Sequence, residues 1–251
     1  MRNYIKAELY RIIHRRYYQL TVLIFMLLSV IGNLAFNFWG TKLTTNPFSA
    51  SMDLLIVTLA ASPFILLAIQ DIVLGDEIKN KTLNNSIANG ISRGKIILSK
   101  IITISIFSAL FSILVIGTYI ITAIVLFGGN KEGFSFINQY FISYLSAIPL
   151  WIGLISFYLI FTVTIQNQVV ANFIILILIY IIPKATRLIV YFKPKLAIIN
   201  SLQPYSVLKR LITLLEMRKM STIDWFAICF GLVFFIISTI VGISVFRKKD
   251  F

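Results

Sequence analysis

The longest strongly polar interval of this chain, residues 75–100, contains the acidic and basic residues whose types and spacing could take part in chemistry. Asp76 and Glu77 stand near its start, and Asn89-Gly90 interrupts it before a second polar stretch. Acidic residues suit the first turn of a helix, and glycine is the usual residue just past a helix end. The interval therefore predicts a short helix, a turn and a helix that leads into an apolar run. Such a helix could act as a rigid lever, and the alternative is a plain solvated loop.

Residue types that serve catalysis and metal binding are scarce in this chain. His14 is the only histidine and Cys229 the only cysteine, which leaves no internal disulfide and no pair of histidine ligands. The nearest approach to a phosphate-binding loop runs from Gly90 to Lys95, but its glycine spacing is short by one and no hydroxyl follows the lysine. We therefore expect no catalytic residue, no metal site and no cofactor in this chain, and no ATP hydrolysis by the chain alone.

The composition indicates an integral membrane protein, and a soluble all-α core is the alternative. Hydrophobic residues make up 59% of the 251 residues, charged residues 13%, and the mean hydropathy is +0.92. Soluble domains are about 45–50% apolar and about 25% charged. Apolar runs long enough to span a bilayer are expected near residues 17–38, 53–74, 101–127, 140–165, 169–183 and 223–246. The sequence thus predicts an all-α, polytopic membrane protein with six transmembrane helices in a single domain, residues 1–251.

Basic residues set the expected orientation. The net charge is +14, and the bases gather at the ends of apolar runs, as on a cytoplasmic membrane face. Residues 1–16 and 75–100 hold five bases each, whereas the first two opposite loops hold only Lys42 and Lys131. We expect both termini and residues 75–100 to be cytoplasmic, with anionic lipid rather than nucleic acid as the partner of this charge. Eight bases in residues 184–222 conflict with this model, and the alternative topology places that segment inside with an external C-terminus.

Two flanking segments read as amphipathic helices. Ile5, Leu9, Ile12 and Ile13 fall on one face of residues 1–16, which predicts a helix lying in the membrane interface; a plain basic flank is the alternative. Residues 184–222 contain apolar residues at helical spacing, and we expect them to form short extracellular helices before the last span.

A few polar side chains within the predicted spans are candidate substrate contacts. An ionisable or strongly polar group at membrane depth is costly and marks a functional hypothesis. Such groups can equally join neighbouring helices by hydrogen bonds. The candidates for the substrate path are Asn33, Asn37, Gln70, Asp71 and Asn172.

The interval after the second span also resembles a known family. Members carry E-x-x-x-G-T-L, then P-x-S-R and a G-K pair that opens the third span. This chain has Glu77-x-x-x-Lys81-Thr82-Leu83, then Gly90-Ile91-Ser92-Arg93 and Ser99-Lys100, with Lys81, Gly90 and Ser99 in place of glycine, proline and glycine. With the order of the six spans, this pattern resembles the second class of ABC exporter permeases, the drug, polysaccharide and lantibiotic export type with the type V exporter fold.

The resemblance implies partners and roles. It implies a dimer of permease subunits, homo- or heterodimeric, in which each subunit docks through residues 75–100 onto a separate ABC ATP-binding subunit that holds ATP and Mg. It makes residues 1–16 the elbow helix and residues 184–222 the helices of the outer mouth. The implied partner-coupling residues are Glu77, Lys81, Thr82, Leu83, Ile87, Arg93 and Lys100.

The function expected from these observations is that of a permease subunit in the plasma membrane of a bacterium. It would move an amphipathic substrate, an antimicrobial peptide or a drug, out of the cell by alternating access. Export of lipid or polysaccharide is an alternative, as is a non-transporting sensor or scaffold subunit.

Overall fold

The computed structural model describes residues 2–39, 44–79, 82, 87–88, 90–165, 167–185, 211 and 223–248. Every regular element in these residues is helical, so the predicted all-α class is confirmed. The helices are α1 (Arg2–Ile13), α2 (Arg16–Trp39), α3 (Pro47–Leu54), α4 (Ile56–Lys79), α6 (Arg93–Phe127), α7 (Lys131–Thr164), α8 (Gln168–Leu176), the π-helical turn η1 (Ile177–Ile181) and α11 (Trp225–Lys248).

Six helices are long and apolar enough to cross a membrane, as predicted. α3 and α4 together form the second, which runs from Pro47 to Lys79, and α8 with η1 forms most of the fifth, Gln168–Ala185. Residues 184 and 185 of the predicted extracellular segment therefore still belong to a spanning helix. Apart from Leu211, the rest of that segment up to residue 222 lies outside the described residues.

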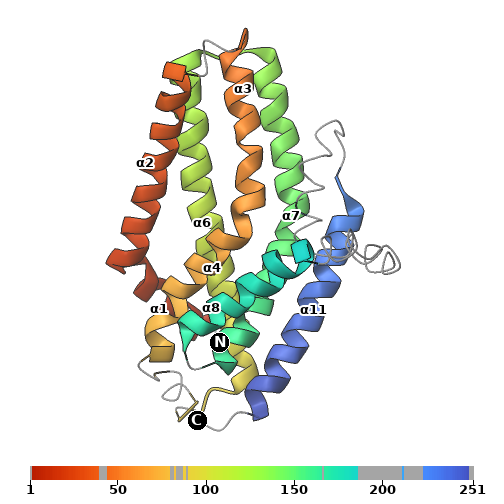
Figure 1. Ribbon diagram of the computed structural model, residues 1–251. Coiled ribbons are helices and arrows are strands. Elements are labelled where there is room, and N and C mark those ends of the chain that lie inside the picture. The colour runs from red at the N-terminus through yellow and green to blue at the C-terminus, as the bar shows by residue number, and fades with distance from the viewer. Residues whose placement is uncertain are drawn as a thin grey trace, which may run out of the picture.

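Figure 1 shows the long helices side by side, with α1 lying across one end of the bundle. The C-terminal end of α4, the start of α6 and the C-terminal end of α11 lie at that same end. α8 runs obliquely across this half of the molecule, and α11 packs along α7. Residues that flank the predicted coupling interval therefore gather with the N-terminal helix.

The third and fourth spanning helices extend beyond a bilayer core. α6 has 35 residues and α7 has 34. At a rise of 1.5 Å per residue each measures about 50 Å, against about 30 Å of hydrocarbon. α6 begins at Arg93 and not near residue 101, so Lys100 is a helical residue two turns from the helix start.

Residues 128–138 lie between the predicted spans at 101–127 and 140–165, where the sequence predicts a loop. They are mostly helical, which corrects the sequence-based boundary. Asn130 caps α7, and its side-chain oxygen accepts a hydrogen bond from the backbone N–H of Gly133 at 2.6 Å. Glu132 occupies the first turn, where a negative charge complements the helix dipole. These local contacts start the helix at Lys131, although the apolar run starts later.

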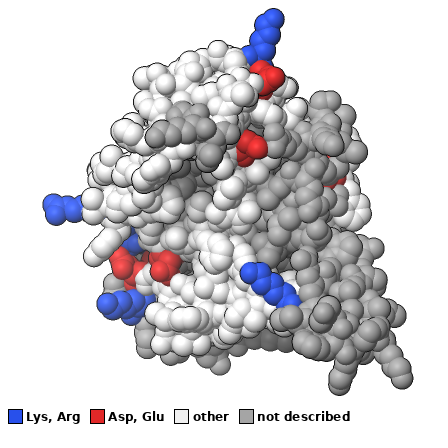
Figure 2. Space-filling view, turned by 45° about the horizontal axis from the view of Figure 1, so that its top comes forward, with Lys and Arg blue, Asp and Glu red and all other residues white. Residues whose placement is uncertain are grey.

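α7 is the central helix of the bundle. Half of its most apolar window is buried inside the protein, against 11% for α2 and for α6. It packs closely on α11, because a Cβ added at Gly231 would lie 2.6 Å from the backbone N of Leu150. Small residues permit such close approach between membrane helices. In the view of Figure 2 most of the described surface is uncharged, as expected for helices that face lipid.

Candidate functional site

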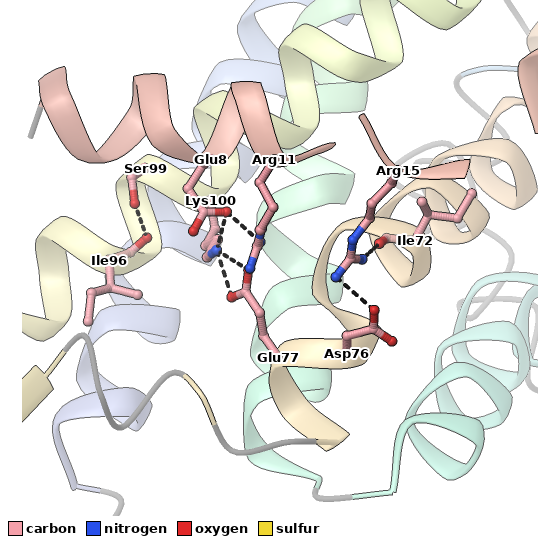
Figure 3. Close-up of polar contacts among 9 residues, drawn as sticks. All are labelled: Glu8, Arg11, Arg15, Ile72, Asp76, Glu77, Ile96, Ser99 and Lys100. Carbon is pink, nitrogen blue, oxygen red and sulfur yellow. Dashed lines mark hydrogen bonds and ion pairs between the residues drawn. The ribbon is translucent and has the colours of Figure 1, made fainter. Parts of the chain in front are cut away.

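Four charged side chains meet where α1, α4 and α6 converge (Figure 3). Lys100 Nζ of α6 lies 2.6 Å from Oε2 of Glu77 at the end of α4 and 2.7 Å from Oε2 of Glu8 in α1. Arg11, one turn after Glu8, forms an ion pair with Glu8 at 2.7 Å and a second with Glu77. We call these four residues the ion cluster. It joins three helices, and its two positive and two negative formal charges cancel.

The ion cluster is largely closed to solvent. The side chains of Lys100, Glu77 and Glu8 are 2%, 4% and 9% exposed, and only Arg11 reaches the surface. The ammonium group also lies 5.6 Å from the centroid of the Tyr4 ring, within the range of a cation–π contact. Buried charges are costly unless they are paired, and here every charge has an opposite charge within hydrogen-bonding distance. The arrangement therefore holds α1, α4 and α6 in one relative position.

The local sequence explains why α1 turns this face inward. Glu8 and Arg11 are three residues apart, so they share a helix face with Ile12, which is fully buried. Of the apolar face predicted from the sequence, Ile12 is buried while Ile13 is 47% exposed. The inward face of α1 is set by the opposite charges on α4 and α6 as well as by apolar area.

A second ion pair fastens the corner between α1 and α2. Arg15 Nη2 lies 2.8 Å from Oδ2 of Asp76, and the same guanidinium donates to the backbone carbonyl of Ile72. Asp76 is exposed, which makes the pair weak by itself. Together with the ion cluster it ties the N-terminal helix to the last two turns of α4.

The other side of the interval is tied to the last helix. Arg93, the first residue of α6, donates to the backbone oxygen of Phe246 at 3.1 Å and of Arg247 at 2.5 Å. A guanidinium at the carboxyl end of a helix satisfies carbonyls that lack helical donors and complements the dipole. Gly90 has a φ of +81°, as expected for the predicted turn before α6.

The structure brings together only part of the predicted coupling set. Glu77 and Lys100 form one buried contact, which also includes Glu8 of α1. Their role in coupling stays a prediction, and because both side chains are buried, any coupling through them would involve α1. Thr82 is exposed, and Ile87 is partly buried against the core. Lys81 and Leu83 lie outside the described residues.

Sequence reasoning did not include Glu8, Arg11 and Arg15 in the site. A signal was present, because Glu8 is the only acidic residue among the first 50. It also falls within the apolar spacing of its helix, between Ile5 and Ile12. An acid on the inward face of a basic helix predicts a buried cation nearby.

The candidate substrate-path residues mostly bind neighbouring helices. Asn33 is fully buried, and its amide donates to Thr122 Oγ1 at 2.7 Å and accepts from Ser51 Oγ at 2.8 Å. Asn172 and Asp71 hydrogen-bond each other at 3.2 Å, which joins α8 to α4.

Gln70 is also buried. Its Nε2 donates to Thr162 Oγ1 at 2.8 Å, while its Oε1 has no partner among the described residues. Asn37 is partly buried on α2. The substrate-path role of all five residues stays a prediction.

The ion cluster links three helices through paired charges. Among the described residues no group of three or more His, Cys, Asp or Glu could hold a metal ion. The ion cluster joins α1, the C-terminal end of α4 and the start of α6, which lie together at one end of the bundle of spanning helices (Figure 1).

Comparison with known proteins identifies the family. No curated protein matches the sequence. A family model described as ABC-2 family transporter protein matches residues 4–184, which include all four residues of the ion cluster. This match covers well over half of the chain, and together with the six spanning helices it shows that the protein belongs to the ABC-2 transporter family as the membrane-spanning permease component of an ABC transporter.

Proposed function

We propose that this permease is part of an exporter, and that an ATP-binding subunit drives it by docking on residues 75–100. Membership of the family implies an ATP-binding partner in general. The observation that carries the docking proposal is the ion cluster. It fastens α4 and α6, the two helices on either side of the interval, to α1. A force on the interval would therefore move three helices together, because paired buried charges resist separation.

The proposed motion is alternating access in a dimer of permease subunits. ATP binding would draw two partner subunits together, and the two ion clusters would follow as rigid joints. Both termini and residues 75–100 would face the cytoplasm of a bacterial cell, in agreement with the excess of lysine and arginine at this end.

The proposed substrate is amphipathic, an antimicrobial peptide or a drug. Within the described spans the side chains proposed for the path are four amides and one carboxylate. Such a path suits a molecule with apolar and uncharged polar faces better than one with a high charge. The resemblance to drug and lantibiotic exporters points to the same class.

The docking test uses exposed positions in the interval. Thr82 and Ala88 are exposed, so Thr82→Asp and Ala88→Asp should leave the fold intact. We expect both to weaken co-purification of a co-expressed ABC ATP-binding subunit and to lower its stimulated ATPase rate in proteoliposomes. Glu132→Lys, at the start of α7, is the matched control at the other end of the bundle and should change neither. If the two aspartate variants retain full binding and ATPase stimulation, the ATP-binding subunit does not dock on residues 75–100.

Direction and substrate are tested with inside-out vesicles. With ATP outside, export predicts that the vesicle lumen accumulates a fluorescent amphipathic peptide. Equal accumulation with a partner that cannot hydrolyse ATP would contradict an ATP-driven exporter. Orientation is tested on a Cys229→Ala background with single cysteines at Ala88 or Lys131. A membrane-impermeant thiol reagent should label Ala88→Cys only in inside-out vesicles and Lys131→Cys only in right-side-out vesicles.

A further inference from the structure

The second spanning helix is interrupted twice, and both interruptions face α7. Leu55 separates α3 from α4, and Pro63 stands inside α4. Proline has no backbone N–H, so the carbonyl of Leu59 loses its helical donor. Such a point in a membrane helix is stable only where another group supplies the hydrogen bond.

At Pro63 a hydroxyl of α4 supplies that hydrogen bond. Ser62 Oγ donates to the Leu59 carbonyl at 2.6 Å, and Trp151 Nε1 of α7 donates to the same Ser62 oxygen at 2.8 Å. Tyr158, one of the largest fully buried side chains, donates its hydroxyl to the carbonyl of Pro63 at 3.1 Å. Two aromatic donors from α7 therefore bind the residue before the proline and the carbonyl of the proline itself.

The same relay is present at the first interruption. Thr58 Oγ1 donates to the Leu55 carbonyl at 2.6 Å and lies 2.9 Å from the hydroxyl of Tyr140. Because the single hydroxyl hydrogen of Thr58 is already used, Tyr140 is the donor of this contact. At both interruptions an α7 aromatic group donates to an α4 hydroxyl, which in turn donates to a backbone carbonyl of its own helix.

The two halves of this helix have different attachments. Before Pro63, Ser51 hydrogen-bonds Asn33 of α2 at 2.8 Å. After Pro63, Gln70 bonds Thr162, and Glu77 enters the ion cluster with α1 and α6. The proline thus divides a part that is bonded to α2 from a part that is held by the ion cluster.

We propose that Ser62-Pro63 is a pivot of the transport motion, and that Trp151 and Tyr158 are positioning residues that hold the pivot in one of two settings. When the half of α4 after Pro63 swings, the hydrogen bonds from α7 break. The bond from Ser62 to Leu59 lies within the helix and persists, so the carbonyl stays satisfied in both settings. The inference rests on the proposed function, because the partner subunit would supply the force on Glu77.

The test measures the bend of this helix directly. Nitroxide labels at Leu54→Cys and Lys79→Cys, both exposed, are placed on a Cys229→Ala background. Their distance distribution is recorded by pulsed electron resonance on the full chain in nanodiscs without a partner. We expect one narrow population, and in Trp151→Phe/Tyr158→Phe a second population at shorter distance. Tyr158→Phe keeps the phenyl ring and removes only the hydroxyl donor, whereas Trp151→Phe removes the indole N–H together with the five-membered ring that carries it. The single variants replace the double variant if it fails to fold.

The matched control is Ser156→Ala. Ser156 bonds Thr239 of α11 at 2.8 Å, so this variant also loses a buried hydrogen bond of α7, but not one to α4. It should lower the unfolding midpoint as the aromatic variants do and leave the distance distribution unchanged. The pivot is overturned if the aromatic variants superimpose on the parent protein, or if Ser156→Ala produces the same second population.

A second arm separates this inference from the proposed function. The partner subunit and ATP are added to the labelled parent protein, and the second population should appear. If the aromatic variants bend without a partner but ATP produces no change in the parent protein, the pivot stands and the ATP-driven function fails. If docking and ATPase stimulation are intact but no variant bends, the pivot fails and the proposed function stands.

Discussion

Lys100 and Glu77 are 23 residues apart in the sequence, yet Lys100 Nζ lies 2.6 Å from Oε2 of Glu77 in the interior of the protein. The contact holds the end of α4 and the start of α6 together on either side of the interval between them. Because Glu8 binds the same ammonium group, the N-terminal helix α1 is attached to both of these helices. The joint is thus built from residues of three separate segments.

Lys100→Met should destabilise the protein strongly. The substitution leaves two buried carboxylates with one cation, and removal of one partner from a buried ion pair costs about 3–5 kcal/mol. The free energy of unfolding is measurable in mixed micelles with increasing denaturing detergent. Lys95→Met, at an exposed position of the same helix, is the control and should shift the free energy by less than about 0.5 kcal/mol. Equal stability of the two variants would contradict the buried cluster.

Asp76→Asn should have a small effect by contrast. Its carboxylate is exposed and pairs with Arg15 in a high-dielectric setting, where such pairs contribute less than about 1 kcal/mol. The same unfolding measurement at low and high salt checks the prediction, since screening should remove the difference between variant and parent protein. A loss of unfolding free energy as large as that of Lys100→Met would mean that the Arg15–Asp76 pair stabilises the contact of α1 with α4 as much as the ion cluster does.

Arg93→Ala should release the end of α11. The loss of a charged donor from two carbonyls costs about 1.5–3 kcal/mol locally. Amide hydrogen exchange of peptides that cover residues 240–248 should become faster, while exchange within α7 stays constant. Arg93→Lys should restore part of the protection, because an ammonium group still complements the dipole. Unchanged exchange in the alanine variant would argue against the clamp.

Gly231→Ala should separate α7 from α11. The added Cβ would lie 2.6 Å from Leu150 N and 2.7 Å from Pro149 C, which are backbone atoms that cannot rotate away. Overpacking of this kind costs about 1–3 kcal/mol, and the unfolding midpoint should fall. Gly117→Ala is the matched control, because nothing lies within 4 Å of its Cβ position. The close packing is refuted if both variants unfold alike.

Asn33→Leu distinguishes a structural role of Asn33 from a contact with substrate. We expect the structural role, and therefore a lower free energy of unfolding. Asn33 joins α2 to Ser51 and Thr122, and hydrogen bonds between membrane helices are worth about 0.6 kcal/mol each. A structural role predicts a lower free energy of unfolding together with intact ATPase stimulation. A substrate contact predicts unchanged stability and altered peptide accumulation in vesicles.

The spanning helices could be predicted because lipid imposes a simple rule on sequence. Each needs a long apolar run, and Leu, Ile, Val and Phe supply it in this chain. The ends could not be placed in this way, since they depend on single contacts. α7 begins at Lys131 because Asn130 caps it, and α6 begins at Arg93, eight residues before the predicted apolar run. Hydropathy does not contain such information.

The candidate site could be predicted only in part. The resemblance to the family motif marks Glu77 and Lys100 as coupling residues, but the sequence does not show that they bind each other. That contact needs α1 to lie across α4 and α6, which is a tertiary arrangement. This arrangement turns the side chain of Glu8 inward. In the sequence, the inward position is indicated only by the fact that Glu8 is a single acidic residue in a basic segment.

The electrical neutrality of the ion cluster bears on the energy source of the protein. A membrane potential does work on a moving charge, about 2.3 kcal/mol per elementary charge for 100 mV. Two carboxylates and two cations that travel as one body carry no net charge through that field. The four charges of the ion cluster therefore contribute no net work against the membrane potential when they move together.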